Sequence, residues 1–480
     1  MAIFKVTPLL LAAITSFFSL EAFAATISLN VTNSVTINNI AYKIVEYIER
    51  DVVVIGGGSS GTYAAIGLLD SNKTVAVIDN QDRMGGHTNT YTDPATGLTE
   101  DYGVVIYHNI DIVKTYAARL NVPLAVADIS GGSTVYADFR TGIENSTYST
   151  AGFTTGLALY IAQLEKYSYV ETGFELPSPV PEDLLLSFGD FAIKYKLGDE
   201  FLGFLFNFAQ GLGDLLSKPT LYVFKNFGMG VIDCLTTGFL GTAAHDNSLI
   251  YENAQAIIGN DNVFLSATIV AVNRNGDCVQ VLISTPSGYK FIEAQKLIFT
   301  IPPKIDNLTG WDLSTTEITL FSQFNNCGYY TAVFTNTGLP TGISITNIGE
   351  NTTYGFPPLP AAYSIGATAI PEIYNMYYGS PTSLPDNEVQ AAMFAEIGKL
   401  QLLNKNNDTS TPELLAYSRH TPFELWVPAE AIEAGFYGEL YGLQGERNTW
   451  YTGAAFHTHD SSMLWQFTEA LMKEIIASLE

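Results

Sequence analysis

The order of apolar runs near the start of the chain indicates a βαβ unit. Residues 52–55 are a β-branched run followed by glycines, as expected for a strand buried on both faces. Residues 60–70 supply the helix that should follow, and the apolar run 73–79 is the next strand. Strand, helix and strand within about 30 residues predict the core of a parallel α/β sheet.

The remaining chain changes character in blocks. Residues 108–245 have a mostly helical pattern, and the clearest helices are predicted at 154–167 and 199–212. Residues 263–302 return to strand character and resemble a β-meander. Residues 450–480 predict a strand, a turn and a final helix with one apolar face.

Residues 1–24 have the features of a cleaved signal peptide. An apolar run from Val6 to Leu20 follows an early lysine, and Ala22-Phe23-Ala24 offers a cleavage site. The run is shorter than the roughly 20 residues that a spanning helix needs, and a retained anchor is the alternative. We therefore expect a secreted, N-glycosylated protein with no membrane segment after cleavage. The candidate glycosylation sites are Asn30, Asn72, Asn145, Asn307, Asn351 and Asn407.

The charge balance excludes one class of partner. The 480 residues include 48 acidic and 22 basic side chains, a formal net charge of -26, which repels nucleic acid. Three cysteines, Cys234, Cys278 and Cys327, allow at most one internal disulfide, and their spacing fits no zinc or haem pattern. We expect no nucleic-acid partner and no bound metal.

A glycine motif lies between the first predicted strand and its helix. Gly56, Gly58 and Gly61 form G-x-G-x-x-G, where they permit a tight turn, close approach of a pyrophosphate and packing of helix on strand. The helix N-terminus around Ser60 offers N–H groups to phosphates. Asp79 ends the second strand, where a carboxylate can bind the adenosine ribose. The pattern predicts a dinucleotide site.

A second glycine pair favours FAD over NAD. Met84 is followed by Gly85, Gly86 and His87, a few residues after the ribose carboxylate. This diglycine brings another stretch of backbone against the pyrophosphate of a flavin dinucleotide, a feature that plain nicotinamide-binding domains lack. We expect FAD as the cofactor.

With these motifs the chain resembles the flavin-containing amine oxidase superfamily, and more closely its fungal β-cyclopiazonate dehydrogenase-like FAD-dependent oxidoreductases. The resemblance implies a Rossmann-type α/β FAD-binding domain formed by 46–107, 246–304 and 440–480. It also implies a mixed α+β substrate domain formed by 108–245 and 305–439.

The same resemblance implies further FAD contacts. The 101–105 stretch would lie along the flavin, the backbone of Ile269 would meet the adenine, and Gly453-Ala454 would meet the ribityl chain. The last helix would open toward flavin N1 and O2, where its positive end stabilises an anionic reduced flavin. The implied contact residues are Gly103, Val104, Val105, Ile269, Gly453, Ala454, Met463 and Leu464.

The catalytic residues are less clear than the cofactor contacts. Many amine-oxidising members hold a lysine near flavin N5, but no lysine occurs between Lys304 and Lys399, which puts simple amine oxidation in doubt. We expect Tyr107-His108 and His457-Thr458-His459 beside the flavin ring, where a histidine can act as a general base. Structural hydrogen bonding is the alternative for each histidine.

Together these features predict an FAD-dependent oxidoreductase that takes a hydride from a C–N or C–H centre of a small, apolar metabolite. Oxygen is the expected acceptor, because a secreted enzyme has no steady nicotinamide supply, and the resemblance implies fungal secondary metabolism. The alternatives are an FAD-dependent desaturase, cyclase or isomerase, and a non-catalytic flavin-binding protein.

Tyrosines between 363 and 378, with Trp426, could line an aromatic cavity or form ordinary core. Covalent flavin attachment, for example through His87 or Cys327, stays open.

Overall fold

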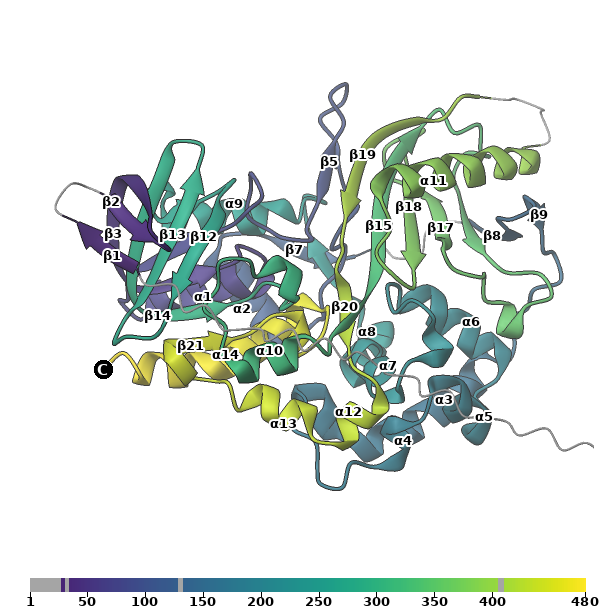
Figure 1. Cartoon of the computed structure of the whole chain (residues 1–480). Helices are drawn as coiled ribbons and strands as arrows, with labels where there is room; N and C mark the ends of the chain where they lie inside the picture. The colour runs from purple at the N-terminus through teal and green to yellow at the C-terminus, as the bar shows by residue number, and fades with distance from the viewer. Residues whose placement is uncertain (1–26, 31–33, 128–132, 405–409) are drawn as a thin grey trace, which may run out of the picture.

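The computed structural model describes residues 27–30, 34–127, 133–404 and 410–480, and of 27–30 only the backbone. Figure 1 shows two lobes side by side: a sheet with flanking helices on the left, and a second sheet above a group of helices on the right. The predicted signal peptide lies outside the described residues.

Parallel strands from three separate parts of the chain form the centre of the first lobe. Their order across the sheet is β11, β4, β3, β14 and β21. These strands are β3 (Ile40–Ile55), β4 (Val75–Ile78), β11 (Val263–Phe264), β14 (Gly288–Phe299) and β21 (Thr449–Tyr451). Val52, Val53 and Val54 are fully buried, as a strand covered on both faces requires. The predicted βαβ unit and Rossmann-type fold are confirmed.

Antiparallel strands extend this sheet at one end. The hairpin of β1 (Ile27–Asn30) and β2 (Ser34–Ile37) pairs with the first half of β3. Strands β12 (Thr268–Asn273) and β13 (Val279–Thr285) continue into β14, so the β-meander predicted at 263–302 is present.

Helix α1 lies at the centre of the helical layer that covers the parallel sheet. It packs against α9 and α14, and α14 also packs against α2. These helices are α1 (Ser59–Asp70), α2 (Asp111–Arg119), α9 (Ser248–Ile258) and α14 (Ser461–Ala477). The final strand, turn and helix predicted for 450–480 are thus confirmed as β21, a 3-10 turn and α14.

Six short helices lie among the described residues between the first two parts of the parallel sheet. They are α3 (Phe153–Leu164), α4 (Glu182–Leu185), α5 (Phe188–Tyr195), α6 (Asp199–Phe208), α7 (Thr220–Asn226) and α8 (Met229–Thr237). The helix predicted to end at 212 stops at Phe208, because the chain turns through Gly211 and Gly213 at φ +89° and +65°. The helix predicted at 154–167 gives way to a 3-10 helix after Leu164.

A second, mostly antiparallel sheet lies above these helices in Figure 1, with α11 (Asp386–Leu400) across one face. Its strand order is β19-β15-β18-β17-β16-β8-β9, and β20 also pairs with β15. The strands are β8 (Ser133–Asp138), β9 (Ile143–Glu144), β15 (Asn325–Thr335), β16 (Ile343–Asn347), β17 (Ala361–Ala367), β18 (Tyr374–Ser380), β19 (Glu413–Arg419) and β20 (Phe423–Trp426).

Smaller elements connect the lobes. Strands β5 and β6 form one hairpin, and β7 pairs with β10. They and the remaining helices are β5 (Thr90–Thr92), β6 (Thr99–Asp101), β7 (Leu124–Val126), β10 (Leu240–Thr242), α10 (Thr315–Phe321), α12 (Ala429–Glu433) and α13 (Phe436–Tyr441).

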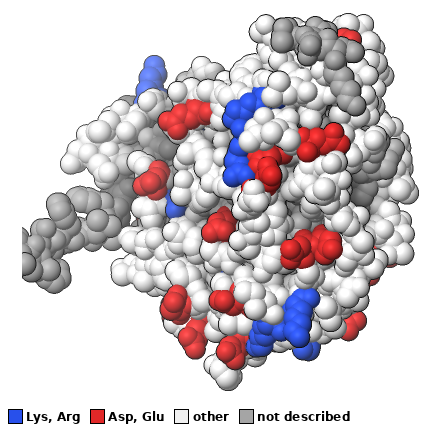
Figure 2. All heavy atoms as spheres, turned by 90° about the vertical axis from the view of Figure 1, so that its right-hand side faces the viewer, with Lys and Arg blue, Asp and Glu red and all other residues white. Residues whose placement is uncertain are grey.

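The surface shows scattered charge. On the face drawn in Figure 2, acidic side chains are spread among uncharged ones, and basic side chains occupy small separate groups. No helix among the described residues is long and apolar enough to cross a bilayer. Cys234 and Cys327 are buried free thiols, and Cys278 is a partly exposed one.

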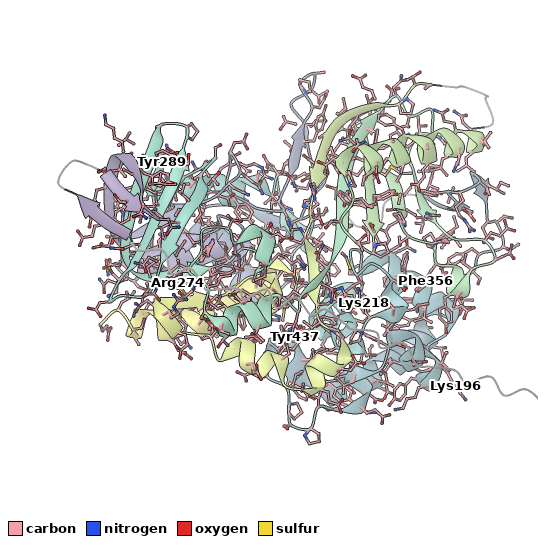
Figure 3. The ribbon with its side chains drawn as sticks, viewed as in Figure 1. Lys196, Lys218, Arg274, Tyr289, Phe356 and Tyr437 are labelled. Carbon is pink, nitrogen blue, oxygen red and sulfur yellow. The ribbon has the colours of Figure 1, made fainter. Side chains whose placement is uncertain are left out.

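A buried ion network ties the meander to the final strand. Arg274, labelled in Figure 3, is fully buried and lies 2.8 Å from Asp312 and 2.7 Å from Glu317. Arg447 approaches the same two carboxylates, at 2.5 and 3.1 Å. Because three of these four charges are buried, the removal of Arg274 leaves two buried carboxylates poorly compensated.

We therefore expect Arg274→Met to lower the free energy of unfolding by about 3–5 kcal/mol, the cost of breaking a buried ion pair. The matched control is Arg119→Met. Arg119 forms an exposed pair with Asp70, whose loss should cost about 0–1 kcal/mol. Urea unfolding followed by circular dichroism measures both variants, and equal losses would contradict a special role for the buried network.

Candidate functional site

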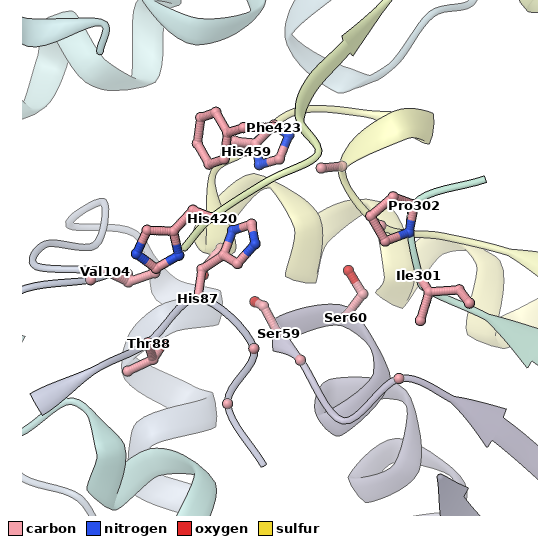
Figure 4. Close-up of a pocket in the computed structure, with 18 of the residues that line it drawn as sticks. Ser59, Ser60, His87, Thr88, Val104, Ile301, Pro302, His420, Phe423 and His459 are labelled. Carbon is pink, nitrogen blue, oxygen red and sulfur yellow. The ribbon is translucent and has the colours of Figure 1, made fainter. Parts of the chain in front are cut away.

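A cavity of about 1170 Å³ opens at the carboxyl ends of the parallel strands. Its walls come from the loops after β3 and β4, the chain after β14 and β21, and residues of α6, α8 and β20. Figure 4 looks into part of this cavity. Ligands of open α/β sheets bind at this edge, because strand ends and helix N-termini converge there.

Glycines permit the tight backbone packing at the start of α1. Gly56 has φ +106°, and a Cβ there would lie 2.3 Å from the hydroxyl oxygen of Thr300. A Cβ at Gly61 would lie 1.9 Å from the carbonyl oxygen of Gly56, so only glycine lets the helix approach the strand this closely. Gly61 packs inside this turn, whereas Gly56, Gly58, Ser60 and Asp79 line the cavity.

The two glycine loops meet at the cavity floor. Gly86 has φ +55°, and a Cβ on it would lie 3.1 Å from the Cα of Gly58. Gly85 and His87 also line the cavity here. The hydroxyl oxygen of Ser60 is buried and has no hydrogen-bond partner among the described residues. A cavity floor made of backbone, together with an unpaired hydroxyl, can donate hydrogen bonds to the oxygens of a diphosphate.

The carboxylate of Asp79 is hydrogen-bonded to the backbone of the loops after β3 and β4, and Asp79 also lines the cavity. Its carboxylate accepts hydrogen bonds from the N–H of Gly57 at 2.6 Å and of Gln81 at 2.8 Å. Burial raises the pKa of Asp79. The carboxylate therefore orders the end of β4 and lies at the place where we predict the ribose.

The remaining predicted cofactor contacts mostly line the same cavity. The lining includes Gly103, Val104, Val105, Ile269, Gly453, Ala454 and Leu464. Met463 does not line it, and its N–H donates to the carboxylate of Asp460 at 3.0 Å as the N-terminal cap of α14. The N–H of Leu464 donates to the backbone carbonyl of Asp460. The flavin contact through these two N–H groups stays a prediction.

His108 lies at the cavity wall in an ion pair. Its Nε2 is 2.9 Å from Asp460, which lines the cavity as well. Burial alone would lower the pKa of His108. The nearby carboxylate of Asp460 has the larger combined effect, so the pKa of His108 is raised. The pKa of Asp460 is lowered to about 2, because His108 and backbone N–H groups outweigh its burial. Sequence analysis did not identify Asp460, whose signal was its position as a helix N-cap.

The structure places the other two predicted catalytic residues away from the cavity lining. Tyr107 is buried in the core and stacks on Trp465 with ring centroids 5.4 Å apart. His457 is also buried, and its Nδ1 lies 2.6 Å from the ammonium nitrogen of Lys225. The position of His457 suits the structural alternative, since a hydrogen bond to Lys225 occupies its side chain, whereas Tyr107 is held by ring packing.

Lys225 is a buried lysine that the sequence offered no reason to select. Its ammonium nitrogen lies 2.8 Å from the carbonyl of Val170 and 3.4 Å from that of Gly173, and it does not line the cavity. Burial lowers the pKa of Lys225 to about 7, since the carboxylates near it do not offset its desolvation.

The aromatic cluster divides between cavity and core. Tyr377 lines the cavity, whereas Tyr374 and Tyr378 belong to the buried core of the second sheet. Trp426 is not part of the lining, and the ammonium nitrogen of Lys218 lies 3.6 Å from the centroid of its ring. Of the two residues named for covalent attachment, His87 lines the cavity and Cys327 does not.

Comparisons with known proteins agree with this geometry. A family model described as an NAD(P)-binding Rossmann-like domain matches residues 54–120. The FAD-dependent oxidoreductase oblC of Cochliobolus heterostrophus is 38% identical, over 97% of this chain and 100% of its own. The β-cyclopiazonate dehydrogenase of Aspergillus oryzae is 34% identical, over 90% of this chain and 94% of its own.

The chain belongs to this family of fungal FAD-dependent oxidoreductases. It is an enzyme whose cofactor is FAD. Solved structures with the same fold include a fatty acid isomerase from P. acnes, with TM-score 0.72, 17% identity and coverage of 88% of this chain and 98% of that one. Putrescine oxidase bound to putrescine has TM-score 0.62, 16% identity and coverage of 90% and 100%.

The glycine floor generates a first test of FAD binding. Gly58 has φ -76°, so Gly58→Ala adds no backbone strain, but its Cβ would enter the space between the two glycine loops. We expect the flavin content of the purified protein to fall at least about tenfold at limiting FAD, a loss of about 1.4 kcal/mol. Gly398→Ala is the control, because a Cβ there meets nothing within 4 Å in helix α11. Full flavin content in Gly58→Ala would place the pyrophosphate elsewhere.

Lys225 generates a test of stability against pH. Its folded pKa of about 7 lies below the ordinary 10.5, so above pH 7 the unfolded chain binds the proton more tightly and stability rises with pH. We expect Lys225→Met to flatten this rise between pH 7 and pH 9 in urea unfolding. Lys473→Met, at an exposed lysine of α14, should leave the slope unchanged. Parallel curves for Lys225→Met and the wild type would contradict the buried charge.

Proposed function

We propose that the protein is a secreted FAD-dependent oxidoreductase of fungal secondary metabolism. It takes a hydride from a C–N or C–H centre of a small, apolar metabolite and passes the electrons to oxygen. The observation that carries the proposal is the continuity of the cavity, which runs from the glycine floor into a compartment with aromatic walls. That compartment is lined by Phe208, Phe239, Tyr329, Tyr377 and Phe423.

The aromatic compartment suits a flat, apolar substrate. It lies between the helices and the second sheet, both of which belong to the second lobe, and a concave apolar site of this kind limits the access of water to the reacting atoms. Polar groups are few there. One is the hydroxyl of Tyr329, which donates to Gln210 at 2.7 Å. Apolar walls with few polar groups favour binding by stacking and burial of hydrophobic surface.

His108 is the candidate general base. Bound FAD supplies the two-electron acceptor for the hydride that leaves the substrate carbon. Asp460 orients the imidazole through Nε2, which leaves Nδ1 as the nitrogen that can accept a proton from a substrate hydroxyl, amine or acidic carbon. Nδ1 is buried beside Gly230 of α8 and has no partner among the described residues. Only neutral His108 can take that proton.

Two features other than the cavity support the proposal that the protein is secreted. The sequons at Asn72 and Asn351 are exposed and outside the cavity lining, so glycosylation in a secretory compartment meets no steric obstacle there. The signal-peptide features of residues 1–24 agree with this route. Glycosidase treatment of the protein recovered from culture medium tests both points, since a mass shift requires glycans and recovery requires export.

The first experiment measures hydride transfer and oxygen use separately. Purified protein is mixed without oxygen with candidate metabolites while the flavin absorbance near 450 nm is followed, and air is then admitted. We expect bleaching by the substrate, and recovery with one hydrogen peroxide per flavin. Recovery of the absorbance before air is admitted would indicate an isomerase or cyclase that returns the hydride to its product, and no bleaching by any metabolite would favour a non-catalytic flavin protein.

The base is tested by the pH dependence of kcat/KM. Because the pKa of His108 is raised, we expect kcat/KM to rise with pH through a value above the ordinary 6.5 of histidine. Asp460→Asn keeps an N-cap residue but removes the charge that raises this pKa, so the acid limb should move to lower pH. His108→Gln should reduce kcat/KM by about 10²- to 10⁴-fold. An unchanged acid limb in both variants would exclude His108.

A further inference from the structure

Three histidines and a phenylalanine form one wall of the cavity. His87, His420, His459 and Phe423, here called the histidine wall, come from the loop after Gly86, the end of β19, the turn before α14 and β20 (Figure 4). The rings of His87 and His459 are parallel with centroids 5.9 Å apart, and those of Phe423 and His459 are 3.9 Å apart. His87 and His420 meet edge to face at 4.7 Å.

One of these imidazoles has a defined tautomer. The backbone N–H of Glu424 donates to Nε2 of His459 at 2.9 Å, so Nε2 is an acceptor and the proton is on Nδ1. Nδ1 has no partner among the described residues. Glu424 holds this N–H with φ +41°, a backbone conformation that is costly for a residue with a side chain. The strained backbone of Glu424 thus fixes the ring of His459, whose Nδ1–H is left to donate to a group in the cavity.

His420 adds a second unpaired nitrogen. Its Nε2 lies 3.1 Å from the hydroxyl of Thr331, whereas its Nδ1 is buried without a partner among the described residues. Buried polar atoms are nearly always hydrogen-bonded, so an unpaired nitrogen in a cavity wall marks a place for a ligand atom.

The histidine wall carries no charge at neutral pH. Burial lowers the pKa of His87 to about 4, with a contribution from Arg83. Burial also lowers the pKa values of His420 and His459 well below the ordinary range, and their histidine neighbours lower them further. The wall therefore presents neutral N–H groups.

No free carboxylate faces the cavity among the described lining residues. The lining includes two carboxylates, Asp79 and Asp460. Asp79 accepts two backbone N–H groups, and Asp460 is shared between His108 and the N–H of Met463. A substrate ammonium would have no counter-ion, and only the faces of aromatic rings could attract it.

We propose that the histidine wall recognises a hydrogen-bond acceptor on the substrate, a carbonyl, enolate or carboxylate oxygen, and that the cavity discriminates against cationic amines. This inference rests on the proposed function, because it names the substrate class of the same cavity. The acceptor oxygen meets Nδ1–H of His459 while the apolar body stacks in the aromatic compartment. The hydride then leaves a carbon near a carbonyl-type group rather than the α-carbon of an ammonium.

The test is a binding titration of the FAD-loaded protein without turnover. The probes share one apolar body and differ at one end: 4-phenyl-2-butanone, 3-phenylpropanoate and 3-phenylpropylamine. Each is added without oxygen at pH 7.5, and the dissociation constant is read from the shift of the flavin spectrum and from calorimetry. We expect the ketone or the carboxylate to bind at least tenfold more tightly than the amine. Equal or tighter amine binding would overturn the proposal.

Two variants locate the effect. His459→Phe keeps a ring but loses the donor, so the preference for the acceptor probes should fall to less than threefold. His459→Asn keeps an N–H near the position of Nδ1 and should retain part of it. His245→Asn is the control, since His245 is exposed, is absent from the cavity lining and has φ +53°, which asparagine tolerates. A full preference in His459→Phe would overturn the role of this residue.

The outcomes separate this inference from the proposed function. Tight binding of acceptor probes to a protein whose flavin no metabolite reduces would leave the recognition intact and reject the oxidoreductase reaction. Rapid flavin reduction by amines that also bind more tightly would retain the reaction and reject the recognition.

Discussion

Direct packing of backbone on backbone at the carboxyl end of β3 determines where the other parts of this molecule lie. Gly61 brings α1 against Gly56, Gly86 brings the second loop against Gly58, and Gly453 brings the chain after β21 against the carbonyl of Thr300. The contacts at Gly61 and Gly453 are closer than a side chain permits, and the contact at Gly86 leaves a Cβ only 3.1 Å from the Cα of Gly58. Segments from the start, middle and end of the chain therefore converge on one edge of the sheet, and the cavity forms where they meet.

The cavity has two electrostatically different sides. On one side His108 and Asp460 form a charged pair at the N-terminus of α14, where the helix dipole and the capping carboxylate balance each other. On the other side the imidazoles of the histidine wall are held neutral by burial. A proton-accepting group and neutral hydrogen-bonding groups thus face one apolar space, which allows one substrate to be oriented by its acceptor while another of its atoms is deprotonated.

The sequence singled out residues of the cavity floor that depend on short-range geometry, and the structure places most of them in the cavity lining. The strand, the glycine motif, the diglycine and Asp79 are close together in the chain, and each has a local conformational reason. The same sequence could not separate His108 from His457, since both are histidines beside predicted flavin contacts. Distant packing separated them: His457 meets Lys225 of α7, and His108 meets Asp460 of the last turn before α14. His420 and Phe423 carried no local signal at all.

The sequence by itself determined the fold class, the cofactor and the edge of the sheet where the cavity opens, because glycine positions and apolar periodicity specify backbone conformation within a few residues. Only the tertiary structure decided which titratable side chains face the cavity and which are charged. Charge depends on burial and on neighbours that are hundreds of residues away, as the pairs Lys225–His457 and His108–Asp460 show. The chemistry of the substrate compartment is therefore a property of the folded chain rather than of any motif in it.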